Sequence, residues 1–132
     1  MEVNIQKGDF TTVKTEALVV FHFEQDDRLL EMTAAVDNAA GSIIARVIEA
    51  GDFRGEHLEQ MLVYSQGSLK TDRLLLIGLG KRAEFTSQTL REATAQALKI
   101  LRERRQPQAV VPVPLDSEFF LGLEDTIEAS VL

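Results

Sequence analysis

The segment Gly78-Leu79-Gly80-Lys81-Arg82-Ala83 contains the residue types that come closest to a phosphate-binding loop. It matches the loose pattern Gly-x-Gly-x-x-Gly/Ala, and it lies between a predicted strand and a predicted helix. Glycines at positions 78 and 80 would let backbone N–H groups approach a phosphate, close to the positive potential of a helix N-terminus. Gly78, Gly80 and Lys81 are therefore the candidate cofactor-binding residues.

The surrounding sequence favours a different role for these glycines. The predicted helix begins only near Thr86, and the first strand–helix unit of the chain lies elsewhere, at residues 16–50. A dinucleotide site also needs an acid at the end of the following strand to hold a ribose, and Pro112 and Pro114 stand there instead. We therefore favour a tight strand-to-loop exit and keep the phosphate loop as the alternative.

Histidines are too few and too far apart in the sequence to suggest a metal centre. His22 lies between Phe21 and Phe23 in an apolar run, and His57 lies in a polar loop. A zinc or two-metal site needs three or four converging ligands. No His-x-x-His, Asp-x-Asp or His-Glu-x-x-His spacing occurs, so we expect no metal ligands and interpret both histidines as structural or solvated.

Carboxylates, serines and cysteines offer no catalytic constellation either. Asp26 with Asp27, and Glu124 with Asp125, fall at predicted helix starts or on polar faces, where carboxylates stay solvated. General acid–base chemistry instead needs burial that separates two pKa values. No serine lies in a Gly-x-Ser-x-Gly elbow, and the chain has no cysteine. We expect no catalytic residue and no cofactor in this chain.

Charge is distributed unevenly along the chain, whose net charge is −7. Residues 81–105 carry seven basic and three acidic side chains, whereas residues 106–132 carry five acidic and no basic ones. An acidic protein binds nucleic acid poorly without a local basic patch. The residues at which a DNA contact could begin are Lys81, Arg82, Lys99, Arg102, Arg104 and Arg105. The last three also suit the negative end of a helix dipole, which is the interpretation we favour.

Alternating strand and helix patterns predict one α/β domain over residues 1–132. The helical patterns cover residues 26–50, with a break near Gly41, and a Thr86-capped helix that ends before Pro107. The short link from Ser65 to Asp72 favours antiparallel pairing, so we predict a mixed sheet with helices on both faces, a three-layer sandwich. The predicted strands are Met1–Gln6, Glu16–Phe23, Gln60–Ser65, Asp72–Leu79 and Ala109–Val113.

The last stretch, Asp116–Leu132, has the spacing of an amphipathic helix, with Phe120, Leu123, Ile127 and Val131 on one face. Because this pattern reaches the final residue without a stop signal, we expect Leu132 to be a boundary inside a longer protein. Apolar runs such as Leu74–Ile77 are too short to span a bilayer, and no secretory signal is visible, so we expect no membrane partner.

Several motifs resemble the N-terminal domain of the cytosolic leucyl aminopeptidase family. The run Asp-Arg-Leu-Leu-Leu-Ile-Gly-Leu-Gly-Lys-Arg-Ala-Glu-Phe-Thr at residues 72–86, followed by Leu-Arg-Glu-Ala at 90–93, is similar to that family's strand ending Val-Gly-Leu-Gly-Lys and its Thr-capped helix. Residues 15–20 resemble its early strand, and residues 51–55 resemble its Gly-Asp-Phe-x-Gly turn. The resemblance covers nearly the whole chain, and residues 127–132 fall where the family has a helix leading toward its catalytic domain.

This resemblance implies a fold similar to macro domains and a cytoplasmic parent enzyme, usually a homohexamer. Members of the family use two divalent metals, zinc or manganese, to remove N-terminal residues from peptides. The metal ligands belong to a C-terminal domain with an Asn-Thr-Asp-Ala-Glu-Gly-Arg motif, which this sequence lacks. The roles that the resemblance implies for residues 1–132 are a scaffold that contacts its own catalytic domain and sister subunits, a contact between trimers, or control of access to the active sites.

Two other functions remain open at this stage. Macro domains bind ADP-ribose, and the loop at Gly78–Ala83 could meet its phosphates, although the stretch Val36–Ser42, which is similar to an Asn-Ala-Ala segment of such domains, lies in a helical pattern. Some bacterial members of the aminopeptidase family bind DNA, for which the basic segment 81–105 would be the contact.

Overall fold

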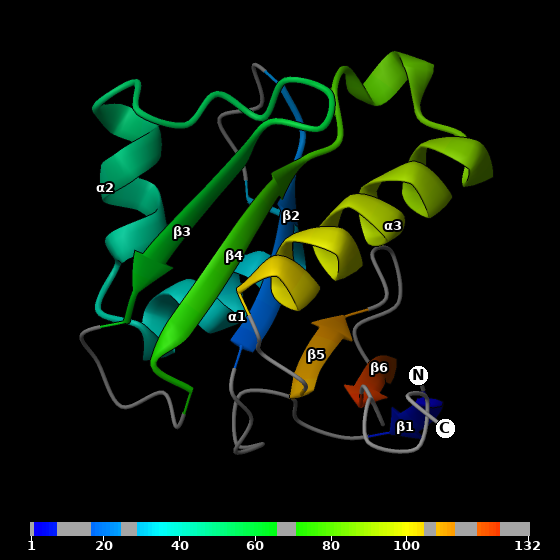
Figure 1. The fold of residues 1–132 in the computed structure, drawn as a ribbon. Coiled ribbons are helices and arrows are strands. Elements are labelled where there is room, and N and C mark those ends of the chain that lie inside the picture. The colour runs from blue at the N-terminus through cyan, green and yellow to red at the C-terminus, as the bar shows by residue number, and fades with distance from the viewer. Residues whose placement is uncertain are drawn as a thin grey trace.

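The computed structural model describes residues 2–7, 17–24, 29–65, 71–104, 108–112 and 119–124. Pairs of strands are separated by helical segments along these residues (Figure 1). Their bounds are β1 Glu2–Lys7, β2 Ala17–His22, α1 Glu31–Ala39, α2 Ile43–Glu49, β3 Gln60–Tyr64, β4 Arg73–Gly78, the 3₁₀ helix η2 Arg82–Glu84, α3 Ser87–Glu103, β5 Gln108–Pro112 and β6 Phe119–Glu124.

The strands form one mixed sheet in the order β1-β6-β5-β2-β4-β3. Strand β2 runs parallel to both β4 and β5, and the remaining neighbours are antiparallel. The short connection between β3 and β4 therefore forms the predicted antiparallel pair, with Leu62 opposite Leu75. The predicted mixed sheet is confirmed.

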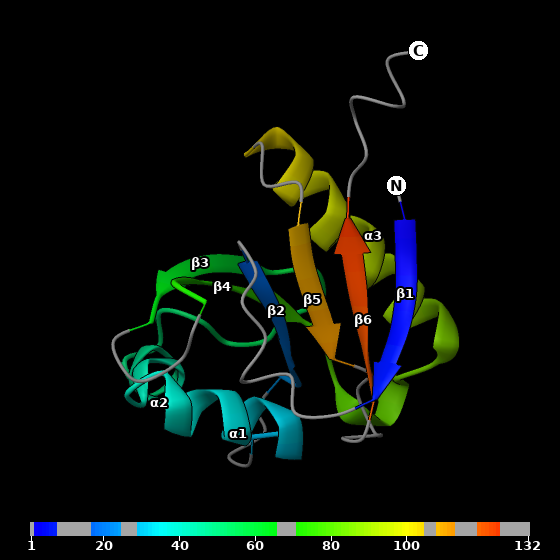
Figure 2. The ribbon, with the colours of Figure 1, turned by 90° about the horizontal axis from the view of Figure 1, so that it is seen from below.

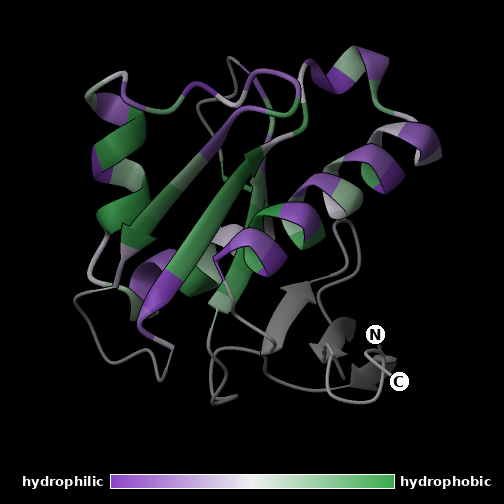
Figure 3. Ribbon diagram, in the orientation of Figure 1, coloured by the Kyte–Doolittle hydropathy of each residue, from purple (hydrophilic) through white to green (hydrophobic). Residues whose placement is uncertain are grey.

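Helices cover both faces of this sheet. Figure 2 shows α1 and α2 on one side and α3 on the other, which confirms the predicted three-layer sandwich. Every residue of β2 is buried, and in β4 only Arg73 is not fully buried. A strand covered on both faces must be apolar throughout, which explains the uninterrupted Leu74–Ile77 run (Figure 3).

Helix α3 packs on the sheet through small side chains. Ala93 and Ala97 are fully buried, with Ile100 and Leu101 also buried near the end of the helix. Alanine at these positions lets the helix backbone approach the strands closely, while the opposite face of α3 is hydrophilic (Figure 3). The predicted helix with its Thr86 cap is confirmed.

The first helical region differs from the prediction at its start. We placed its opening at Asp26–Asp27, which lie outside the described residues, whereas α1 begins at Glu31 with Leu30 as its N-cap. Leu30 has the extended angles φ −55° and ψ 148°, so it precedes the helix although its apolar spacing fits one.

The predicted break near Gly41 is confirmed, and a buried acid stabilises it. Gly41 and Ser42 both have left-handed backbone conformations, with φ of 75° and 61°. The Asp37 carboxylate accepts hydrogen bonds from the N–H groups of Ile44 at 2.8 Å and Ala45 at 3.4 Å. These are unpaired N–H groups of the first turn of α2, so Asp37 caps α2 from within α1. The helical pattern that we assigned to the Asn-Ala-Ala-like stretch is thus correct for most of its length.

The helix predicted over Asp116–Leu132 is wrong for Phe119–Glu124, which form β6. This strand lies between β1 and β5 and is antiparallel to both, with Val3 opposite Leu123 and Val110 opposite Gly122. The spacing of Phe120 and Leu123 fits a helix, but the backbone groups of this segment pair with two neighbouring strands, one of them distant in the sequence, and a local pattern does not contain that pairing. Residues 125–132, the rest of that prediction, lie outside the described residues.

Candidate functional site

The candidate loop leaves the carboxyl end of β4, beside the carboxyl end of the parallel strand β2. The N–H of Leu79 donates to the His22 carbonyl at 2.9 Å, and the N–H of Glu24 donates to the Gly80 carbonyl at 2.8 Å. The two chain segments that leave these strands are therefore joined by backbone hydrogen bonds beyond the ends of the strands themselves.

A third segment, the loop at residues 53–59, closes over this point. Gly80 donates its N–H to the Gly55 carbonyl at 2.9 Å, and Gly78 donates to the Glu59 carbonyl at 2.8 Å. In return, the Gly78 carbonyl accepts from the N–H of Leu58 at 3.0 Å. We call this arrangement of Gly55, Gly78 and Gly80 with their backbone partners the glycine junction.

Each glycine of the junction is required by close backbone approach or by a left-handed conformation. A Cβ atom on Gly78 would overlap the carbonyl oxygen of Glu56. Gly55 has φ +80°, and its Cβ would lie 2.9 Å from the carbonyl carbon of Phe23. Gly80 has φ +76°, which L side chains rarely adopt. The structure therefore supplies a structural reason for both glycines of the candidate motif.

The hydrogen bonds of the junction also limit what the loop can offer a ligand. The N–H groups of Gly78, Leu79 and Gly80 all donate to carbonyls of the chain itself, so none of the three points at an open phosphate position. Lys81 follows them with an exposed side chain. The assignment of Gly78, Gly80 and Lys81 as phosphate-binding residues stays a prediction, and Lys81 is the member whose functional group reaches solvent.

The sequence motif did not indicate the two residues that complete the junction, Gly55 and Glu59. The Glu59 carboxylate accepts hydrogen bonds from the N–H groups of Arg54 and Glu56, each at 3.0 Å, and thereby holds the loop around Gly55 in shape. The Gly-Asp-Phe-x-Gly turn carried a signal for Gly55, but nothing in the sequence linked that turn to Gly78.

Beyond the junction, η2 folds back over Phe23. The guanidinium of Arg82 lies 4.4 Å from the centre of the Phe23 ring, and Phe85 contacts the same ring edge-on at 5.3 Å between centroids. Phe23 is buried. Arg82 therefore has an aromatic partner within the domain, which gives its side chain a structural role.

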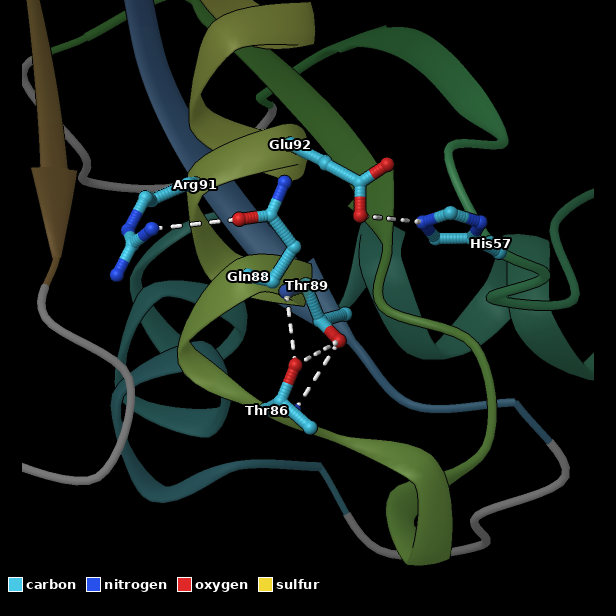
Figure 4. Close-up of polar contacts among 6 residues, drawn as sticks. All are labelled: His57, Thr86, Gln88, Thr89, Arg91 and Glu92. Atoms are coloured by element: carbon cyan, nitrogen blue, oxygen red, sulfur yellow. Dashed lines mark hydrogen bonds and ion pairs between the residues drawn. The ribbon is translucent and has the colours of Figure 1, made fainter.

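The two histidines occupy different environments. His22 is buried at the end of β2, with its ring centre 6.5 Å from that of Phe53. His57 is exposed, and its Nε2 lies 3.9 Å from the Glu92 carboxylate of α3 (Figure 4). A loose, exposed pair of this kind contributes little to stability. In the part of the chain that the structure describes, no three histidine or acidic side chains come together as a metal-binding group.

Helix α3 begins directly after this region with a capping box. The Thr86 hydroxyl accepts from the N–H of Thr89 at 3.3 Å, and the Thr89 hydroxyl accepts from the N–H of Thr86 at 3.1 Å (Figure 4). These bonds satisfy N–H groups at the N-terminus of α3 with side chains of the helix itself.

The basic segment lies on and around α3. Lys81, Arg82 and Lys99 are exposed, and Arg102 and Arg104 are exposed at the end of the helix. Arg105 lies outside the described residues. Arg102 is in the last turn of α3, where a cation favours the negative end of the helix dipole. No described helix is long and apolar enough to cross a lipid bilayer.

The fold places the chain in a structural class. A macrodomain from Mycobacterium tuberculosis DarG superposes on 86% of this chain and 77% of its own, with a TM-score of 0.63 and 14% sequence identity. At that identity the likeness concerns the fold, so the chain is a macrodomain-like α/β sandwich.

Sequence comparison then identifies the family. The family described as the cytosol aminopeptidase family, N-terminal domain, matches residues 17–131. A probable cytosol aminopeptidase of Geobacter sp. (strain M21) is 33% identical over 133 residues, and one of Halorhodospira halophila is 30% identical over 114 residues. The chain belongs to the cytosol aminopeptidase family and corresponds to its N-terminal domain, as the sequence motifs predicted.

The relatives are much longer than this chain. The aligned region covers 100% of this chain and 26% of the Geobacter protein, and 86% of this chain and 23% of the Halorhodospira protein. This chain therefore spans about a quarter of the length of these relatives.

Proposed function

We propose that this chain is the non-catalytic N-terminal domain of a leucyl aminopeptidase, a cytoplasmic metalloprotease that removes N-terminal residues from peptides. In this proposal the domain is a scaffold that contacts its own catalytic domain and the sister subunits of a homohexamer. Two divalent metals, zinc or manganese, would bind in the catalytic domain.

The observation that carries this proposal is the glycine junction, together with family membership. At the carboxyl ends of β2 and β4, where α/β proteins commonly place their sites, the backbone groups of Gly78, Leu79 and Gly80 bond to the chain itself. The described histidines and acids also do not fit a metal pair, because no three of them converge. A scaffold is compatible with backbone groups that are bonded within the chain, whereas a catalytic site at this end of the sheet would need groups that can contact a substrate.

The experiment compares cleavage of leucine p-nitroanilide by two proteins. One is the 132-residue chain and the other is a full-length relative such as the Geobacter protein, both with added zinc or manganese. We expect turnover by the full-length protein and none by the 132-residue chain. Metal-dependent turnover by the purified chain, in the fractions that contain it, would contradict the proposal.

A second candidate function is binding of ADP-ribose or a related phosphate ligand. The macrodomain-like fold supports it, and the exposed Lys81 beside the glycine junction is the group best placed to meet a phosphate. Calorimetry of the chain with ADP-ribose, repeated with Lys81→Ala, tests it. Absence of binding heat at millimolar ligand removes this candidate.

A DNA contact is the third candidate, favoured by the exposed cations Lys81, Arg82, Lys99, Arg102 and Arg104. Electrostatic binding is strongest at low salt. A mobility shift of duplex DNA that disappears as salt rises would support this candidate, and no shift at low salt would end it.

A further inference from the structure

Strand β3 forms one outer edge of the sheet, because β4 is its neighbour on one side and the strand order ends with it on the other. The hydrogen bonds at its two ends show which of its residues point their backbone N–H and C=O groups toward β4. Ser65 donates to the Asp72 carbonyl at 2.9 Å, and the Glu59 carbonyl accepts from Gly78 at 2.8 Å. The direction of the backbone N–H and C=O groups alternates along a strand. The groups of Met61 and Val63 therefore also point toward β4, and those of the even-numbered residues point outward.

Within its described bounds, β3 carries none of the charged residues and prolines that commonly keep edge strands from associating. The residues whose backbone groups point outward are Gln60, Leu62 and Tyr64. The strand Gln-Met-Leu-Val-Tyr contains no charged residue and no proline. The opposite edge, β1, carries Glu2 and Lys7. Charged residues and prolines are the common protection of an exposed edge.

Tyr64 adds an apolar surface to the same edge. It is 59% exposed, and among the described residues it is the exposed large hydrophobic side chain. The Arg73 guanidinium lies 5.9 Å from the centre of its ring, and more than half of the side chain is still exposed. An exposed aromatic ring beside open backbone groups is typical of a strand-docking surface.

We propose that β3 pairs antiparallel with β3 of a second copy of this chain, around a two-fold axis at Leu62. This inference deepens, and rests on, the proposed contact between sister subunits. Leu62 would face Leu62 of the second copy, and Gln60 would face its Tyr64, so all outward N–H and C=O groups of both strands would be paired. Self-pairing brings identical strands together, and the absence of charge on β3 means that no like charges within the strands oppose it.

Hydrogen exchange on the wild-type chain gives the first test. In the paired form the amides of Gln60, Leu62 and Tyr64 become protected, and this protection rises with protein concentration. The amides of Met61 and Val63 bond to β4 in either form, so their exchange is the internal control and should not change with concentration. A monomer by sedimentation up to millimolar concentration, or uniform exchange along β3, would overturn the inference.

Two charge variants give the second test. Gln60→Glu keeps the oxygen that accepts from Gln96 of α3 at 2.9 Å. Combined with Tyr64→Glu it places Glu opposite Glu across both symmetric pairs, whereas combined with Tyr64→Lys it places Glu opposite Lys. Within one strand these positions lie roughly 13 Å apart, so the chain's own repulsion is small. We expect the dissociation constant of the Glu/Glu variant to exceed that of the Glu/Lys variant about tenfold or more.

The matched control adds the same two negative charges elsewhere. Gln88 and Ala95 are exposed on α3, and Gln88→Glu retains the oxygen that accepts from Arg91. The variant Gln88→Glu with Ala95→Glu should dimerise like wild type. Equal dissociation constants for the Glu/Glu and Glu/Lys variants would contradict pairing through β3. These results are independent of the cleavage assay, so failure of this pairing and failure of the non-catalytic assignment can be told apart.

Discussion

At the scale of single residues, Gly78 of the candidate phosphate motif and Gly51 show that glycine can be required for two different physical reasons. Gly78 has no left-handed conformation, yet a Cβ there would overlap the Glu56 carbonyl oxygen. Gly51, at the end of α2, has φ +78° and no atom within 4 Å of its Cβ position. The first glycine is required by space and the second by backbone conformation, and a sequence pattern alone does not separate these causes.

Substitution at these two positions separates the causes experimentally. We expect Gly78→Ala to destabilise the domain by about 2 kcal/mol or more, because backbone atoms of the junction must move to admit the methyl group. Gly51→Ala should cost about 1 kcal/mol, the strain of a left-handed alanine. Urea unfolding monitored by circular dichroism measures both.

Asparagine provides the control for that comparison. Asparagine tolerates the left-handed conformation, so Gly51→Asn should recover much of the stability lost in Gly51→Ala, whereas Gly78→Asn should be at least as destabilised as Gly78→Ala. If Gly78→Ala were as stable as the wild type, the backbone of the 53–59 loop could not lie as close to β4 as the structure shows.

At the scale of elements, the sequence predicted those parts whose signals are local. The strand predicted at Met1–Gln6, the apolar runs of β2 and β4, and the threonine cap of α3 each depend on neighbouring residues. The structure confirms a strand at Glu2–Lys7, the strands β2 and β4, and the cap. The contacts of the glycine junction join residues at least nineteen positions apart in the sequence. Their pairing depends on the sheet order, which no local pattern contains.

The error at β6 has the same origin. Phe120 and Leu123 have helical spacing, but Gly122 between them disfavours a helix, and Phe119–Leu121 is an uninterrupted apolar run. Such a run is typical of a strand that is buried on both faces, which is the criterion that correctly identified β2. That this segment forms a strand depends on β1 and β5, which supply its hydrogen-bonding partners on either side, and this is a property of the assembled sheet.

Helix α3 offers a prediction about its N-terminus. Thr86→Ala removes the hydroxyl that accepts from the Thr89 N–H and should destabilise the domain by about 1 kcal/mol. The control is Thr94→Ala in the middle of the same helix, which should be neutral or slightly stabilising because alanine has the higher helix propensity. The measurement is the midpoint of urea unfolding, and equal midpoints for the two variants would argue against the capping box.

At the scale of the whole molecule, the two ends of the described chain hold each other in the sheet. Strand β1 is the edge of the sheet, and its neighbour is β6, while β6 in turn joins β1 to β5 (Figure 2). Strands β2, β4 and β3 are not paired with β1. The fold therefore predicts that β1 depends on β6 more than on its own sequence neighbours.

A shortened chain that ends at Asp116 tests this dependence. It also distinguishes a strand at residues 119–124 from the helix that the sequence pattern predicted there. Without β6, the amides of β1 lose their hydrogen-bonded partner, so their exchange should accelerate strongly while the amides of β2 and β4 keep most of their protection. A chain that ends at Glu124 retains β6 and is the control, in which β1 should stay protected. If residues 119–124 were a surface helix, the sheet pairing of β1 would not involve them, and its amides would exchange equally slowly in both shortened chains.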